Sequence, residues 1–149
     1  MRATAGSDKK LLLSVMGALE AATGLVLLVA PSMLVELLLG APPGTSVGVT
    51  VSRVAGAALL SLGVACWLAR NDAASATAKG LIAAMLLYNV GAVVVLVPAW
   101  ISPGLSGIAF WPVVLAHTGL AAWCVVCLVT RAPKENSGAP RCGWRARTR

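Results

Sequence analysis

Apolar residues run along this chain in four long stretches, separated by short breaks rich in Pro, Gly, Ser or charge. The stretches cover residues 11–30, 47–69, 80–97 and 107–130. A hydrocarbon core about 30 Å thick is crossed by roughly 20 helical residues, so each stretch is long enough to span it. None of them alternates with the period of two that barrel strands show. The pattern predicts an all-α integral membrane protein, folded as a four-helix bundle.

The segments outside these stretches differ from one another. Residues 33–40, MLVELLLG, are apolar apart from one acid and are followed by Pro42 and Pro43, which predicts a short interfacial helix after the first span. This helix would cap the bundle or act as a lid over a cavity. Residues 134–149 are rich in Arg, Gly and Pro and predict a basic, disordered cytoplasmic tail. Residues 1–133 then form a single domain of four transmembrane helices.

The positive charges indicate which way the helices run. Only 11% of the residues are charged and 58% are hydrophobic, whereas about a quarter of residues are charged in soluble domains. Lys and Arg residues in short loops are retained in the cytoplasm. Apart from Arg53, they all lie before the first stretch, between the second and third, or after the fourth. We therefore expect a multi-pass protein of the bacterial inner (plasma) membrane with both termini cytoplasmic, and no nucleic-acid partner despite the net charge of +7.

Residues 11–30 also allow an alternative interpretation, a cleaved signal peptide, because two lysines precede them. Cleavage would leave three helices in the same orientation. The length of the stretch, Glu20 at its centre and Pro31 directly after it favour a retained helix.

Each predicted span carries one strongly polar residue in its middle to outer half. These residues are Glu20, Arg53, Asn89 and His117. A charged side chain inside a span costs about 2.5 to 3.5 kcal/mol on insertion scales and usually faces the bundle interior. Glu20 and Arg53 differ in depth by roughly 6 Å, which an Arg side chain can bridge, so an ion pair between the first two helices is predicted.

Small residues support close packing around this pair. Gly17 and Gly24 flank Glu20 at helical spacing, and Gly56 and Gly63 lie near the Arg53 face. With all four polar residues inward, Glu20, Arg53, Asn89 and His117 would form one cluster. It could serve as interhelical hydrogen bonding that fixes the register, as a binding site for a small polar or amphipathic ligand, or as a proton relay through Glu20 and His117.

Cysteines give a further candidate chemistry. Cys124 and Cys127 lie three residues apart in the last span and form a possible thiol pair on one helix face. His117 is about 10 Å from Cys124 along the axis, too far to share a metal ion, and no metal site is expected. Cys66 turns roughly 140° away from Arg53 and would face lipid or a different seam. Cysteine is also a common small apolar residue in buried helices, which is the simpler explanation.

The first two spans read SVMGALEAATGL from Ser14 and RVAGAALLSLGV from Arg53, and the first ends in Ala-Pro. This arrangement, across four short apolar segments, resembles the small DoxX-like membrane proteins of bacteria. The resemblance implies a compact four-helix bundle and, for some members, a supporting role in membrane-associated quinone or sulfur redox chemistry.

These features favour a ligand-binding or accessory membrane component over an enzyme, and they name no cofactor. The expected partners are the lipid bilayer and a small amphipathic ligand or another membrane protein. Two alternatives stay open: a subunit of a quinone or thiol redox system, and a small transporter that acts as an oligomer.

Overall fold

The computed structural model describes residues 2–101 and 105–130, in which the chain forms five α-helices and one short 3-10 helix. The long helices are α1 (Arg2–Val29), α3 (Ser46–Ala69), α4 (Ala76–Ile101) and α5 (Phe110–Val129). The short ones are α2 (Pro31–Leu39), which follows α1, and η1 (Arg70–Asp72), which follows α3. All four long helices have the length and apolar composition of membrane spans. The predicted all-α four-helix membrane bundle is confirmed, whereas the predicted tail at 134–149 lies outside the described residues.

The start of each long helix differs from that of its predicted span, and local hydrogen bonds explain the differences for α4 and α5. The start of α4 lies at Ala76 rather than at residue 80, because the Ser75 hydroxyl accepts a hydrogen bond of 3.0 Å from the backbone N–H of Ala78. The same helix continues past Pro98, where a proline near the helix end removes a single backbone donor. Helix α5 begins at Phe110 rather than at residue 107, because the preceding residues bond to α2.

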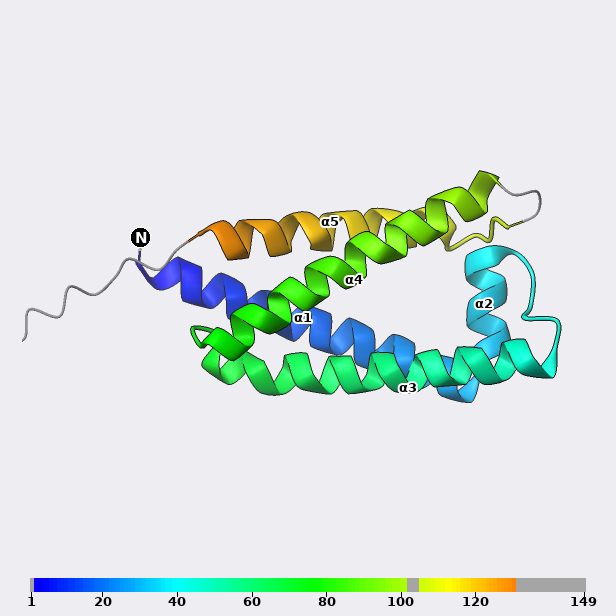
Figure 1. Cartoon of the computed structure of the whole chain (residues 1–149), viewed down its shortest axis with the longest axis horizontal. Coiled ribbons are helices and arrows are strands. Elements are labelled where there is room, and N and C mark those ends of the chain that lie inside the picture. The colour runs from blue at the N-terminus through cyan, green and yellow to red at the C-terminus, as the bar shows by residue number, and fades with distance from the viewer. Residues whose placement is uncertain (1, 102–104, 131–149) are drawn as a thin grey trace, which may run out of the picture.

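Helix α2 stands across one end of the bundle, nearly at right angles to the long helices (Figure 1). Its first residue is Pro31, which needs no backbone donor at that position and restricts Ala30 before it, so α1 stops and the chain turns. Gly40 ends the helix in the left-handed region at φ 80° and donates its N–H to the carbonyl of Glu36. The short helix expected near residues 33–40 therefore exists, with both ends defined by Pro and Gly.

Backbone hydrogen bonds attach α2 to the segment before α5. The N–H groups of Gly107 and Ala109 donate to the carbonyls of Leu38 and Leu37, at 3.1 and 2.9 Å. These carbonyls belong to the last turn of α2, where a helix has no internal donors left. A Cβ at Gly107 would lie 2.1 Å from the Leu37 oxygen, so this approach requires glycine. The connection ties the first half of the chain to the second.

Helices α1 and α3 form the most closely packed pair. A Cβ built on Gly24 would lie 2.5 Å from the backbone nitrogen of Leu60 and 2.6 Å from the carbonyl oxygen of Gly56. Seven residues further along each antiparallel helix, the pair Gly17 and Gly63 makes a similar approach. Because lipid gives no hydrophobic drive for helices to associate, such backbone contact is a main source of their attraction.

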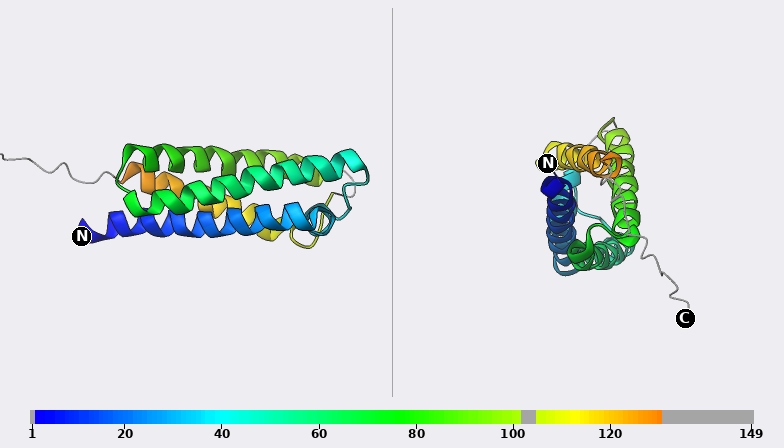
Figure 2. Two further views of the ribbon diagram at one scale, coloured as in Figure 1. Left: turned by 90° about the horizontal axis from the view of Figure 1, so that it is seen from below. Right: turned by 90° about the vertical axis from the view of Figure 1, so that its left-hand side faces the viewer.

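Helices α4 and α5 form the second pair, and the four long helices follow one another in order around the bundle axis (Figure 2). We call the end where α1 starts and α5 finishes the basic end, and the opposite end the α2 end. Apart from Phe110 and Val114 at the start of α5, the fully or nearly buried large side chains lie in the half next to the basic end. They are Leu12, Leu13, Met16, Cys66, Ile82, Met85, Cys124 and Cys127.

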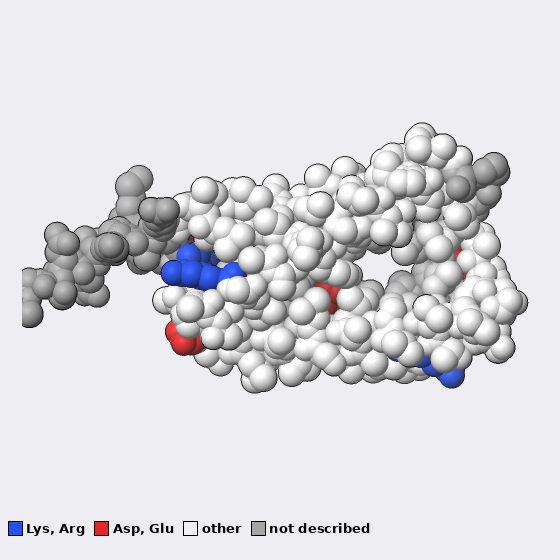
Figure 3. Space-filling model, viewed as in Figure 1, with Lys and Arg blue, Asp and Glu red and all other residues white. Residues whose placement is uncertain are grey.

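The half next to α2 is packed differently. Beyond Glu20, the only residue of α1 that is buried is Gly24, and α4 has no buried residue beyond Asn89. On the same half of α3 the buried residue is Gly56, and on α5 the buried residues are Phe110 and Val114. The space-filling view shows an opening between the α1/α3 pair and the α4/α5 pair, closed off at the far end by α2 (Figure 3). The two helix pairs therefore meet through side chains at the basic end and separate towards α2.

The close contact of α1 with α3 generates a prediction. Gly24→Ala places a methyl group within 2.5 Å of backbone and should destabilise the bundle by about 1 to 3 kcal/mol. Gly91→Ala is the matched control, since a Cβ there meets nothing within 4 Å. The control should be neutral or stabilising by up to about 1 kcal/mol through its helix propensity. Unfolding in mixed detergent micelles measures both, and equal effects would contradict the packing.

Candidate functional site

The best-defined polar contact inside the spans joins α4 to α5. The side-chain oxygen of Asn89 lies 2.8 Å from Nδ1 of His117. The Asn89 amide nitrogen is already committed, because it donates to the carbonyl of Met85 at 2.7 Å. Since that leaves only an acceptor facing the ring, Nδ1 of His117 carries a proton and donates it. In the neutral ring Nε2 then stays free as an acceptor.

Tyr88 extends this contact towards α1. Its ring packs edge-to-face against the His117 ring, with centroids 5.6 Å apart and an interplanar angle of 78°. Its hydroxyl faces the carboxyl of Glu20 in a looser polar contact. Glu20 is only 4% exposed, and Asn89 is completely buried. We call Glu20, Tyr88, Asn89 and His117 the polar cluster; it joins α1, α4 and α5 at the depth where the two helix pairs begin to separate.

Arg53 does not belong to this cluster, and the predicted ion pair is wrong. Its side chain is exposed, and no salt bridge joins it to Glu20 in the described part of the chain. At about 100° per residue, Gly56 and Gly63 lie roughly 70° around α3 from Arg53, and Cys66 lies roughly 140° away. Because α1 packs over those glycines, Cys66 turns into the core and Arg53 turns out of it.

The exposed position of Arg53 is compatible with a membrane. The residue lies about 10 Å from the start of α3 at Ser46, at about 1.5 Å per residue. An Arg side chain is long enough to bring its guanidinium to the headgroup region from such a depth. Arg53 therefore needs no acidic partner, and Glu20 is left without a basic one.

Tyr88 was not among the predicted site residues, although the sequence held a signal for it. It is the only tyrosine in the chain, it adjoins Asn89, and it falls in the middle of a span rather than at an interface. Tyr side chains in membrane proteins prefer the interfaces, where the hydroxyl meets water, so a mid-span Tyr indicates an internal polar partner.

Models of known protein families, curated proteins and solved structures were compared with the chain, and none of them matches it.

The three described cysteines meet in the core near the basic end. Cys66 and Cys124 are fully buried, Cys127 is 2% exposed, and all three are free thiols. Of the two surroundings predicted for Cys66, lipid is excluded, because the side chain is fully buried in the same core as Cys124 and Cys127. Across residues 6–101 and 105–130, no three His, Cys, Asp or Glu side chains group closely enough to hold a metal ion.

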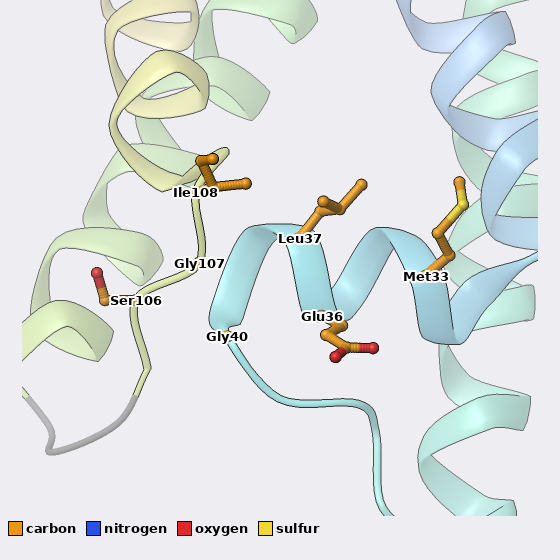
Figure 4. Close-up of a pocket in the computed structure, with 7 residues that line it drawn as sticks. All are labelled: Met33, Glu36, Leu37, Gly40, Ser106, Gly107 and Ile108. Atoms are coloured by element: carbon orange, nitrogen blue, oxygen red, sulfur yellow. The ribbon is translucent and has the colours of Figure 1, made fainter.

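A pocket of about 420 Å³ lies at the α2 end, away from the polar cluster. Its lining residues come from α2 and from the segment before α5, and are Met33, Glu36, Leu37, Gly40, Ser106, Gly107 and Ile108. In the close-up the Glu36 carboxylate points away from the side on which Met33 and Leu37 lie (Figure 4). Glu36 is exposed, so it differs from Glu20 in being free to meet solvent or headgroups.

The Asn89 to His117 contact predicts a measurable coupling. In a double-mutant cycle with Asn89→Ala and His117→Ala, the pair should show about 0.6 kcal/mol of coupling, and at most about 2. The control pair is Asn89 with Thr118, whose hydroxyl bonds to the carbonyl of Val114 instead. Unfolding free energies in detergent give both couplings. A control value as large as that of the Asn89 and His117 pair would speak against a specific bond.

Proposed function

We propose that this chain is a membrane protein whose polar cluster binds a small amphipathic ligand, and that it serves as a binding or accessory component rather than as an enzyme. The observation that carries the proposal is Glu20, a carboxyl that is 4% exposed at mid-span with no basic partner among the described residues. Ionisable groups retained at such depth are costly and usually serve a pathway, a ligand or a partner. The hydrogen bond between Asn89 and His117 already links α4 to α5, so interhelical bonding alone does not explain why Glu20 is present.

The packing around Glu20 supports a ligand rather than a closed core. Next to the basic end large apolar side chains are buried against one another, while towards α2 the helix pairs separate and leave an opening (Figure 3). The polar cluster lies at the boundary between these regions. A molecule with a polar head and an apolar body fits this arrangement, with its head at Glu20 and its body between the helix pairs.

We further propose that the protein lies in a bacterial inner membrane with its basic end in the cytoplasm. Lys9, Lys10, Arg70 and Lys79 all belong to that end, whereas residues 30–45 and 105–109 at the α2 end contain no Lys or Arg. Retention of positive charge in the cytoplasm supports this orientation.

A role in a quinone or thiol redox system, which the DoxX-like resemblance implies, is the second candidate. The meeting of Cys66, Cys124 and Cys127 in one core favours it. The double variant Cys124→Ser and Cys127→Ser separates the two functions, since ligand binding at Glu20 should survive it and a thiol reaction should not. A third candidate is a transporter that acts as an oligomer, for which the exposed apolar faces of the long helices supply contact area.

Native mass spectrometry of the detergent-purified protein tests the ligand proposal. The wild type should retain a small molecule that Glu20→Gln loses by at least about tenfold, because the substitution removes the carboxyl's negative charge and replaces one acceptor oxygen with an NH2 donor. Glu36→Gln is the control, since it removes the same charge at an exposed position. The same spectra give the oligomeric state. Ligand-free species in both the wild type and Glu20→Gln would leave the cluster with a structural role only.

Labelling of intact cells tests the orientation. Ser46 and Ser106 are exposed at the α2 end, so cysteines introduced there should react with membrane-impermeant maleimide. Asn71→Cys at the basic end is the control and should stay protected until the cells are opened. A Cys142→Ser background leaves Cys66, Cys124 and Cys127, all of which are buried, as the remaining cysteines. Protection at both serine positions would reverse the topology.

A further inference from the structure

The charge around the polar cluster narrows the class of ligand. Glu20 is the acid within the long helices that is remote from both ends of the bundle. Among the described basic residues, Lys9, Lys10, Arg70 and Lys79 belong to the basic end. Arg53 is exposed, on a face of α3 that is turned away from the core. No salt bridge reaches Glu20 in the described structure, and its polar neighbour is the neutral hydroxyl of Tyr88. The cluster thus offers one potential negative charge with nothing to balance it.

An unbalanced carboxylate in a low-dielectric site favours a positively charged occupant. Burial of a lone charge is expensive, while a paired charge with good geometry recovers most of that cost. Tyr88, whose hydroxyl contacts the carboxyl, packs edge-to-face against the His117 ring, and the face of a tyrosine ring attracts organic cations within about 6 Å. A cation would let Glu20 ionise as its counter-charge, whereas an anionic ligand would gain no such partner.

The position of the opening determines the route by which a cationic ligand reaches Glu20. It lies between the α1/α3 and α4/α5 pairs within the apolar length of the helices, and α2 closes its end (Figure 3). Between the opening and the basic end, buried side chains fill the core. Entry from the hydrocarbon, sideways between the helix pairs, is therefore the direct route to Glu20, and it demands a molecule that dissolves in the bilayer.

We propose that the ligand is an amphipathic organic monocation, which enters from the bilayer, places its charged centre against Glu20 and leaves its apolar body between the two helix pairs. This inference rests on the proposed function and adds the sign of the ligand charge. A site for a monocation should bind anionic lipids and neutral amphiphiles less well than the cation. It also differs from a contact surface for a second copy of the chain, which would not bind the free ion.

Two ions of the same size and opposite charge test the sign. Tetraphenylphosphonium and tetraphenylborate should be titrated into the full chain in nanodiscs of zwitterionic lipid, with equilibrium dialysis to count bound ion against empty nanodiscs. Tetraphenylphosphonium should bind saturably and tetraphenylborate should not. Glu20→Gln should weaken the cation by at least about tenfold, because one partner of a buried charge pair is lost. Glu36→Gln should change it by less than about twofold.

Wild-type protein alone gives an independent test, in case Glu20→Gln does not fold. Dodecyltrimethylammonium should displace bound tetraphenylphosphonium, whereas dodecanol, with the same tail and no charge, should not. Equal displacement by both, equal binding of the two tetraphenyl ions, or unchanged binding in a folded Glu20→Gln variant would each overturn the inference.

The outcomes separate this inference from the proposed function. A neutral molecule that copurifies with the wild type and is lost from Glu20→Gln, together with no saturable cation binding, would reject the monocation and keep the ligand site. Absence of both would reject both. A dimer that binds neither ion would assign the opening to a second copy of the chain and would also overturn the inference.

Discussion

Direct contact between two backbones sets the rotation of α1 and α3, and the positions of the other polar groups depend on it. Where Gly24 faces Gly56 and Gly17 faces Gly63, no side chain separates the helices, so neither helix can turn about its axis without a clash. With this rotation fixed, Glu20 and Cys66 turn inward and Arg53 turns outward. In lipid, where apolar side chains gain little by leaving their surroundings, such close packing is a strong determinant of helix orientation.

The tight pair also explains the uneven packing of the bundle. Helices α4 and α5 meet α1 and α3 through the large side chains near the basic end, and at the other end through the backbone bonds of Gly107 and Ala109 to α2. Between these two attachments the pairs separate. The chain is thus joined at both ends and open between them, an arrangement that places a lipid-facing opening beside the polar cluster.

The chemistry of the cluster follows from which groups satisfy one another. Asn89 and His117 form a bond with defined donor and acceptor roles, and Tyr88 contacts both the His117 ring and Glu20. Glu20 alone has no partner of opposite charge in the described residues. A bundle that needed only interhelical hydrogen bonds would be more stable with a neutral residue there, because a lone acid in hydrocarbon carries a cost that packing does not return. That cost is the physical ground for a functional interpretation of the site.

The sequence by itself determined the four spans, the short helix after the first span, and the depth of each polar residue, because length, hydropathy and a rise of about 1.5 Å per residue are local properties. It also gave the relative angle of Arg53 and Cys66 on their own helix. Only the tertiary structure decided which of the two faces the interior, since the periodicity of one helix does not say where its neighbours lie. For the same reason only the tertiary structure shows that Tyr88 belongs to the polar cluster and that Arg53 does not. It also shows that α5 begins at Phe110, because the residues before it bond to α2, which is distant in sequence.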